Sequence, residues 1–198
     1  MKNTLITIVA VAALLLASVQ ETQAQAWEKS SKVLSLGFGV SQFYHLDGYY
    51  YANNKGKFKR GYYNSTTGQF NFQGEFGIHE YVGLGFTVGL GGRGGWGNNY
   101  LGEINIPMGM LANFHFYQLI DDKNSKDIHA DKLDIYAGIA VGSGLAFTYY
   151  DNTSRRVVPL AWGGPHAGIR YYFTPKVAVN AEVGFGRSLV NVGFSFKL

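Results

Sequence analysis

The sequence has no cysteine among its 198 residues, and only four prolines. Disulfide bonds and a lipidated N-terminal cysteine are therefore excluded. Charged residues make up 15% of the chain, against about 25% in soluble domains. So little charge is unusual for a surface that faces water on all sides. The net charge of +4 is mild and predicts no nucleic-acid partner.

Long hydrophobic runs are also lacking, apart from one near the N-terminus. Lys2 precedes an apolar run over Leu5–Ala17, and Ala24–Ala26 offers a small-x-small cleavage site. The run is too short to span a bilayer comfortably. We therefore expect an exported protein with a signal peptide over residues 1–26 and one domain over residues 27–198.

The remainder of the chain is rich in glycine (27 residues) and in aromatic residues (16%), which alternate with a period of two. In the stretch Val82–Gly92, for example, one face is Val, Leu and Phe and the other is almost entirely Gly. A sustained period of two predicts β-strands. Eight segments share this pattern: 33–41, 69–78, 82–92, 103–110, 133–147, 160–173, 177–185 and 190–198.

The composition of the second face decides which way such a barrel is turned. A soluble barrel would bury its apolar face and cover the other with Lys, Glu, Asp and Thr, whereas here the second face is mostly Gly, Ser and Asn. In the reverse arrangement the apolar face meets lipid and the small polar face packs inside a narrow lumen. The sequence thus predicts an all-β protein, an eight-stranded antiparallel up-and-down transmembrane β-barrel.

The connections between these segments alternate in length, as they do in outer-membrane barrels. Those expected on the periplasmic side, with both termini, are His79–Tyr81, Gln118–Lys132 and Thr174–Lys176. Those expected outside are Tyr44–Gly68, Gly91–Tyr100, Tyr149–Pro159 and a brief bend at Gly186–Ser188. The Gln118–Lys132 connection is unusually long for a periplasmic turn.

The C-terminal stretches "GIRYYFTPK" and "VAVNAEVGFGRSLVNVGFSFKL" resemble the final hairpin of the small outer-membrane β-barrel domain family of Gram-negative bacteria, similar in architecture to OmpA- and OmpX-type barrels. The resemblance covers Lys32–Leu198. It implies localisation in the outer membrane. Phe194, Phe196 and the terminal Leu198 resemble the signal read by the barrel-assembly machinery, which the resemblance implies as a partner through the C-terminal strand. It brings no catalytic residues.

Residues that could support catalysis do not form a recognisable site. Asp121 and Asp122 lie in a connection expected on the periplasmic side, and neither His115 nor His166 has a serine nucleophile beside it. The five histidines show no metal-ligand spacing. We expect no enzymatic activity, no cofactor and no metal.

Several charged residues fall on the inward face of the predicted barrel, where an unpaired charge is costly. Counting back from the Thr174–Lys176 turn sets Arg170 opposite Asn180, with Glu182 as a diagonal neighbour. We expect a lumen charge network of Arg170 and Glu182, with Glu75 as a third member facing Gly85. The alternative is a polar pore, although eight strands leave little open diameter.

The first external connection combines tyrosines with a cluster of cations around a turn at Asn53–Gly56. One interpretation is an aromatic girdle below a solvated tip. The other is a loop that binds lipopolysaccharide or another anionic glycan, with cations attracting phosphates and tyrosines providing stacking surfaces. The residues of this candidate site are Lys55, Lys57, Lys59, Arg60, Tyr50, Tyr51, Tyr62 and Tyr63.

The sequence therefore favours a non-enzymatic, monomeric outer-membrane protein with a structural or surface-interaction role in the cell envelope, in contact with outer-membrane lipid and lipopolysaccharide. A small-solute channel is the alternative, and an outer-membrane lipid-modifying enzyme comes third.

Overall fold

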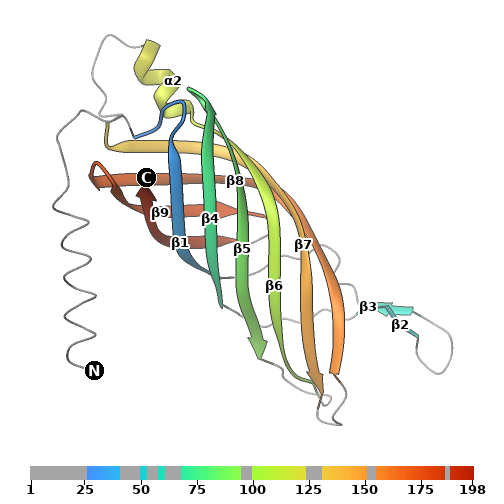
Figure 1. Ribbon diagram of the computed structural model, residues 1–198. Helices are drawn as coiled ribbons and strands as arrows, with labels where there is room; N and C mark the ends of the chain where they lie inside the picture. The colour runs from blue at the N-terminus through green and yellow to red at the C-terminus, as the bar shows by residue number, and fades with distance from the viewer. Residues whose placement is uncertain are drawn as a thin grey trace, which may run out of the picture.

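The chain forms a closed antiparallel β-barrel in which each strand pairs with its neighbours in the sequence (Figure 1). This computed structural model describes residues 26–40, 50–52, 58–60, 68–94, 100–123, 131–150, 155–185 and 188–198. The barrel strands are β1 (Lys32–Val40), β4 (Gly68–His79), β5 (Val82–Gly94), β6 (Tyr100–Phe114), β7 (Leu133–Tyr150), β8 (Arg155–Thr174), β9 (Val177–Gly184) and β10 (Val190–Lys197). β1 closes the barrel by pairing with both β4 and β10. The predicted all-β, up-and-down barrel of eight strands is confirmed.

The strand ends differ from the sequence prediction on the side of the longer connections. The bounds expected for the Tyr149–Pro159 connection are wrong, because β7 continues to Tyr150 and β8 already begins at Arg155. β5 likewise extends to Gly94. Paired backbone groups satisfy one another whether or not lipid surrounds them, so the ladders continue beyond the length that a membrane requires. β6, β7 and β8 are consequently much longer than β9, β10 and β1.

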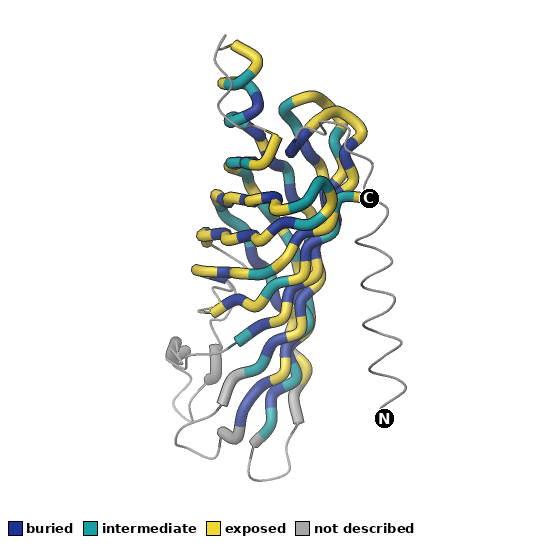
Figure 2. Tube along the Cα trace, turned by 90° about the vertical axis from the view of Figure 1, so that its left-hand side faces the viewer, coloured by how far each residue is buried: buried dark blue, intermediate teal, exposed yellow. Residues whose placement is uncertain are grey.

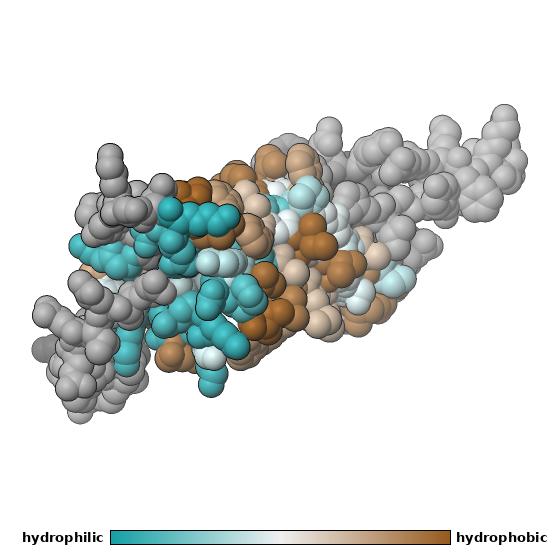
Figure 3. All heavy atoms as spheres, turned by 90° about the horizontal axis from the view of Figure 1, so that it is seen from above, coloured by the Kyte–Doolittle hydropathy of each residue, from teal (hydrophilic) through white to brown (hydrophobic). Residues whose placement is uncertain are grey.

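Side chains alternate between a lipid-type exterior and a polar interior, which appears along the strands as alternating exposed and buried positions (Figure 2). On the outside, Phe70 and Val141 are each 67% exposed. On the inside, Gln69, Asn105 and Arg170 are fully buried. Viewed from the end that carries the helix after β6, hydrophilic side chains gather in one area of the surface, with hydrophobic ones beside them (Figure 3). This inverted distribution is the one expected for a barrel embedded in lipid.

Inward glycines make room for the few large side chains in the lumen. A Cβ added to Gly109 would lie 2.6 Å from Cζ2 of Trp162, and Gly142 faces the same indole. Trp162 itself is buried against Ala146 and Leu160. The conformational cost of glycine in a strand is therefore offset by the packing of a neighbouring aromatic ring.

Proline interrupts the wall at one place. The register between β5 and β6 runs as far as Val88–Met108 and resumes at Gly91–Asn105. The missing pairs surround Pro107, which has no N–H to donate to the ladder.

The predicted periplasmic end contains the short turns, both ends of the described chain and one helix. The helix α2 (Phe116–Lys123) begins just before the connection that we expected over Gln118–Lys132. Its Asp122 accepts hydrogen bonds from the Tyr81 hydroxyl (2.9 Å) and from Nε2 of Gln118 (3.0 Å). The bond to Asp122 raises the pKa of Tyr81 above its usual value. Among the described residues, no helix is long and apolar enough to cross a bilayer.

Candidate functional site in the lumen

The lumen is filled near the predicted periplasmic end by a buried network of charges centred on Arg170. From β8, Arg170 donates through Nη1 to Oδ2 of Asp134 (3.0 Å) and through Nη2 to Oε2 of Glu75. Its guanidinium also lies over the Tyr136 ring, 4.3 Å from the centroid. All four side chains are buried. One cation from β8 thus holds together carboxylates from β7 and β4, strands on opposite parts of the wall.

His115 joins the same two carboxylates from the other side. Its Nδ1 lies 2.7 Å from Oδ1 of Asp134, and its Nε2 lies 3.0 Å from Oε1 of Glu75. Asn113 donates to the same Glu75 oxygen (2.8 Å). Since each carboxylate has partners on both oxygens, neither is left as an uncompensated buried charge.

Two further contacts extend the network along the lumen. Nε2 of His166 lies 2.7 Å from Oδ1 of Asn113. The Tyr136 hydroxyl donates to Oε2 of Glu182 (3.1 Å). We call this set the lumen network: Glu75, Asn113, His115, Asp134, Tyr136, His166, Arg170 and Glu182.

The N-terminal segment closes the mouth beneath this network, and we call residues 27–31 the N-terminal stopper. The fully buried indole of Trp27 stacks on the ring of His115, with centroids 3.6 Å apart and planes 5° apart. Ala26, the last residue of the expected signal peptide, packs against Tyr172 and Ala178. A bulky aromatic side chain therefore occupies the space through which a solute would leave the lumen.

Backbone bonds fix the stopper to β4. Ser30 N–H donates to the Gly77 carbonyl (2.8 Å), and Gly77 N–H donates to the Ser31 carbonyl (2.8 Å). Ser30 has a φ of 72°, which turns the chain back toward the barrel. Nζ of Lys197 adds an ion pair with Glu28 (3.0 Å). The stopper is thus part of the folded barrel.

Gly83 provides the room for the Trp27 indole, and this position allows a test. A Cβ at Gly83 would lie 2.8 and 2.9 Å from two ring atoms of Trp27 and would also meet Glu75. We expect Gly83→Ala to lower the free energy of unfolding by about 1–3 kcal/mol, because it overpacks a filled mouth. Urea unfolding of the refolded protein in lipid vesicles measures this change.

Gly92→Ala is the matched control in the same strand, where the nearest atom to an added Cβ is the Glu103 carbonyl oxygen at 3.3 Å. It should cost clearly less than Gly83→Ala, since one contact at 3.3 Å requires a shift of only a few tenths of an ångström. Equal effects of the two substitutions would show that Trp27 does not depend on the space at Gly83.

The structure brings some of the predicted lumen residues together directly. Arg170 contacts Glu75, and the register pairs Arg170 with Asn180 and Glu75 with Gly85 as counted from the sequence. Glu182 lies on the same inward face, with Tyr136 as a hydrogen-bond donor. A direct pair between Arg170 and Glu182 stays a proposal.

Sequence reasoning did not place Asp134, His115 and Trp27 in the network. Asp134 carried a usable signal, because it lies on the inward parity of its strand and pairs with Arg170 in the β7–β8 register. His115 follows the last residue of β6, and Trp27 precedes β1, so neither belongs to a period of two. Only the folded chain brings them together.

Neutral polar residues elsewhere in the lumen also bond to one another. Nδ2 of Asn71 donates to Oδ1 of Asn191 (3.0 Å), and the hydroxyls of Ser35 and Ser195 lie 2.7 Å apart. Both pairs are buried. These two pairs satisfy one another, as polar side chains do in a packed protein interior.

The candidate glycan-binding loop lies largely outside the described residues, as do Lys55, Lys57, Tyr62 and Tyr63. The backbone of Tyr50, Tyr51, Lys59 and Arg60 lies in β2 (Tyr50–Ala52) and β3 (Phe58–Arg60), which pair antiparallel. The hairpin expected around Asn53–Gly56 is thus present in its two strands.

The residues that the sequence offered for catalysis take part in hydrogen bonds within the fold. Asp122 is bonded within the predicted periplasmic end, and His115 and His166 are bonded within the lumen network. Among the described residues, no group of three or more His, Asp or Glu side chains could hold a metal ion. The lumen network has the chemistry of an internal structural link.

Comparison with known proteins relates the chain to barrels by fold. No protein-family model and no curated sequence matches it. The crystal structure of the outer membrane protein OprG from Pseudomonas aeruginosa matches with a TM-score of 0.60 and 12% identity, over 90% of this chain and 99% of that one. The N-terminal β-barrel domain of Pseudomonas aeruginosa OprF matches with a TM-score of 0.52 and 12% identity, over 86% and 98%. The chain therefore has the fold of the eight-stranded β-barrels of the Gram-negative outer membrane.

Proposed function

We propose that this protein is a non-enzymatic integral protein of the outer membrane whose rigid barrel holds a cationic loop at the cell surface. The observation that carries the proposal is the packed lumen: Arg170, Tyr136, His115 and Trp27 are all buried within it. Buried side chains that bond to one another across the lumen, as Arg170 does to Glu75 of β4 and Asp134 of β7, stabilise a barrel, whereas a transport path needs open polar space. The exposed apolar belt supports residence in lipid.

The runner-up function, a small-solute channel, gives an opposite expectation for conductance. With the N-terminal stopper in place, the refolded protein should show no stable single-channel conductance in planar bilayers, because Trp27 and the lumen network fill the mouth. A heat-unfolded sample is the control for membrane leakage. Stable conductance steps that require the folded protein would contradict the scaffold function and support the channel function.

The surface role is assigned to the first external loop, on the basis of its sequence. Lys55, Lys57, Lys59 and Arg60 fall within six residues, among tyrosines. We expect the quadruple change of these cations to serine to leave the barrel folded and to weaken association with lipopolysaccharide by about tenfold at low salt. Co-sedimentation with lipopolysaccharide across a salt series measures the loss.

The chain offers a matched control at its other end. Lys29, Lys123, Lys132 and Lys176 are exposed near the predicted periplasmic mouth. Changing these four to serine removes the same charge, so a general effect of net charge would weaken binding equally in both variants. Equal binding by wild type and the loop variant would return the loop to the status of a solvated hairpin. Cleavage or acyl transfer detected on lipopolysaccharide during the assay would overturn the non-enzymatic assignment.

A further inference from the structure

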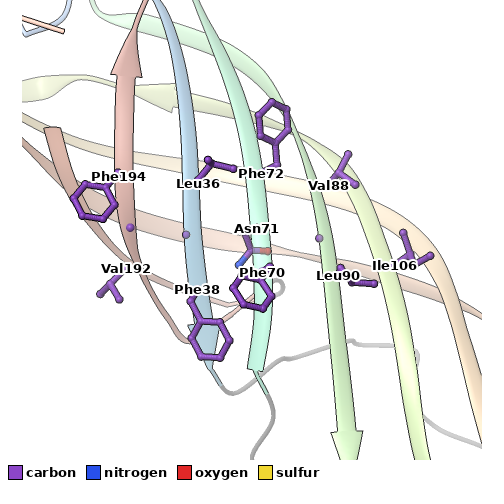
Figure 4. Close-up of a pocket in the computed structure, with 13 residues that line it drawn as sticks. Leu36, Phe38, Phe70, Asn71, Phe72, Val88, Leu90, Ile106, Val192 and Phe194 are labelled. Atoms are coloured by element: carbon purple, nitrogen blue, oxygen red, sulfur yellow. The ribbon is translucent and has the colours of Figure 1, made fainter. Parts of the chain in front are cut away.

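A shallow trough crosses the outside of the barrel over β10, β1, β4 and β5 (Figure 4). It runs across the strands, between two rows of outward side chains that the strand registers align. The row nearer the long connections is Val192, Phe38, Phe70 and Leu90, and the other row is Phe194, Leu36, Phe72 and Val88. The backbone of the positions between the rows forms the floor: Gly193, Gly37, Asn71 and Gly89. We call this feature the outer trough.

The outer trough is apolar throughout, and its size suits a flexible chain. It has a volume of about 650 Å³. Neighbouring strands lie about 4.8 Å apart, so from β10 to β5 it spans about 15 Å, comparable with an extended fatty-acyl chain. Phe38 and Phe70 meet edge to face in one wall, with centroids 5.1 Å apart. At the β5 end it reaches Ile106, beside the interruption at Pro107.

The chemistry of the trough excludes a polar occupant. Asn71 is the polar member among the lining residues, and its side chain is buried on the lumen side, where it bonds to Asn191. The trough therefore presents neither a charge nor a free hydrogen-bonding side chain among the residues that line it. A sugar or a peptide backbone bound there would lose its hydrogen bonds to water without replacement.

The depth of the trough in the membrane further restricts which molecule can occupy it. The upper wall lies close to the ends of the strands that lead into the predicted external connections: Phe38 is two residues from the end of β1, and Phe70 two from the start of β4. In the proposed orientation this is the outer-leaflet half of the membrane. The connection between β1 and β4, the two central strands of the trough, carries Lys55, Lys57, Lys59 and Arg60.

We infer that the outer trough binds one fatty-acyl chain of lipid A, the lipid anchor of lipopolysaccharide. This rests on the proposed surface role and names its partner as the lipid part of lipopolysaccharide. Strands in such barrels tilt by about 35–45°. The trough therefore runs obliquely through the leaflet, a direction that a tilted acyl chain can follow while its headgroup reaches the surface. Van der Waals contact with aromatic walls favours an ordered chain over bulk lipid.

The test removes the two rings of the upper wall. The variant Phe38→Ala/Phe70→Ala is refolded in detergent micelles and titrated with purified lipid A, and native mass spectrometry counts the bound lipid. We expect affinity about tenfold below wild type. The control is Phe76→Ala/Phe114→Ala, which removes two lipid-facing rings that are 46% and 42% exposed, lie toward the opposite ends of their strands and do not line the trough. It should bind lipid A as wild type does.

A second variant keeps the apolar surface and fills the trough. Leu90→Trp enlarges one side chain of the upper wall, which narrows the trough at its β5 end and should also reduce binding several-fold, with folding checked by the heat-dependent shift on gels. Lipid A stripped of its acyl chains but retaining its phosphates is the second probe. Wild type should bind it about tenfold more weakly than intact lipid A, whereas the Phe38→Ala/Phe70→Ala variant should show no such difference.

The outcomes separate the trough from the loop. Loss of binding in the trough variants with none in the loop-to-serine variant would remove the loop from the proposed function and keep the acyl site. Loss of lipid A binding only in the loop variant would contradict the proposal that the trough binds an acyl chain. Equal competition by phosphatidylglycerol would show a general acyl site and overturn the assignment to lipid A, as would wild-type binding by both trough variants.

Discussion

Replacing Arg170 by alanine is expected to lower the free energy of unfolding in lipid vesicles by about 3–5 kcal/mol, the cost of breaking a buried ion pair by removing one partner. Arg170 bonds to both Glu75 and Asp134, and all three side chains are at most 2% exposed. Without the guanidinium, two carboxylates share a confined space with His115. Equilibrium urea unfolding, followed on gels that separate folded from unfolded barrel, measures the loss.

The double variant Arg170→Ala/Glu75→Ala identifies the cause. If the loss comes from stranded charge, the double variant should be more stable than the sum of the single effects predicts, by at least about 1 kcal/mol. The same cycle with Glu182→Ala tests the proposed coupling of Arg170 to Glu182. Lys176→Ala, an exposed position in a turn, should change stability by less than about 0.5 kcal/mol. Simple additivity in the Glu75 cycle would exclude a coupled pair.

The barrel itself could be predicted because its physics is local and repeated. In β4, for example, Phe70, Phe72 and Phe76 face outward while Gln69 and Glu75 face inward, and a period of two is legible without any partner strand. The registers beside short turns followed as well. Arg170 lies opposite Asn180 because the turn at Thr174–Lys176 fixes the count.

The lumen network could be predicted only in part, because contacts across a barrel join strands that are distant in sequence. Arg170 and Glu75 are 95 residues apart and lie on strands that do not pair with each other. The alternation along each strand indicates that both side chains point inward. It does not indicate at which level along the barrel axis each side chain lies, and therefore whether the two meet. Trp27 enters from outside any strand pattern, so its stacking on His115 had no periodic signal.

Strand length was the other feature that could not be predicted from the sequence. Alternation in the Tyr149–Pro159 region gives way to Tyr, Arg and Asn, residues typical of connections, although β7 and β8 continue through most of it. Outside the membrane both faces of a strand can be polar. Hydrophobic alternation therefore reports the embedded part of a barrel strand, while backbone pairing decides where the strand ends.

Replacing Phe86 by arginine tests the orientation of the whole barrel, and we expect it to cost about 2–4 kcal/mol in bilayers. Phe86 lies in the middle of the β4–β5–β6 surface, opposite Gly74 and Met110. Its ring approaches those of Phe72 and Phe76, with centroids 5.9 and 6.5 Å away. A guanidinium there must reach water across hydrocarbon, whereas in a soluble barrel the same outward position would be solvated at little cost.

Two controls separate the charge from the lost ring and from arginine in general. Phe86→Leu removes the aromatic contacts but stays apolar, so it should cost clearly less than Phe86→Arg. Val82→Arg places the same side chain at the first residue of β5, next to the turn, where the expected cost is about 0–1 kcal/mol because the headgroup region is within reach. Folding efficiency into vesicles and urea unfolding measure all three variants. If Phe86→Arg inserts and unfolds like wild type, the apolar face does not meet lipid, and the proposed embedding of the barrel in a membrane is wrong.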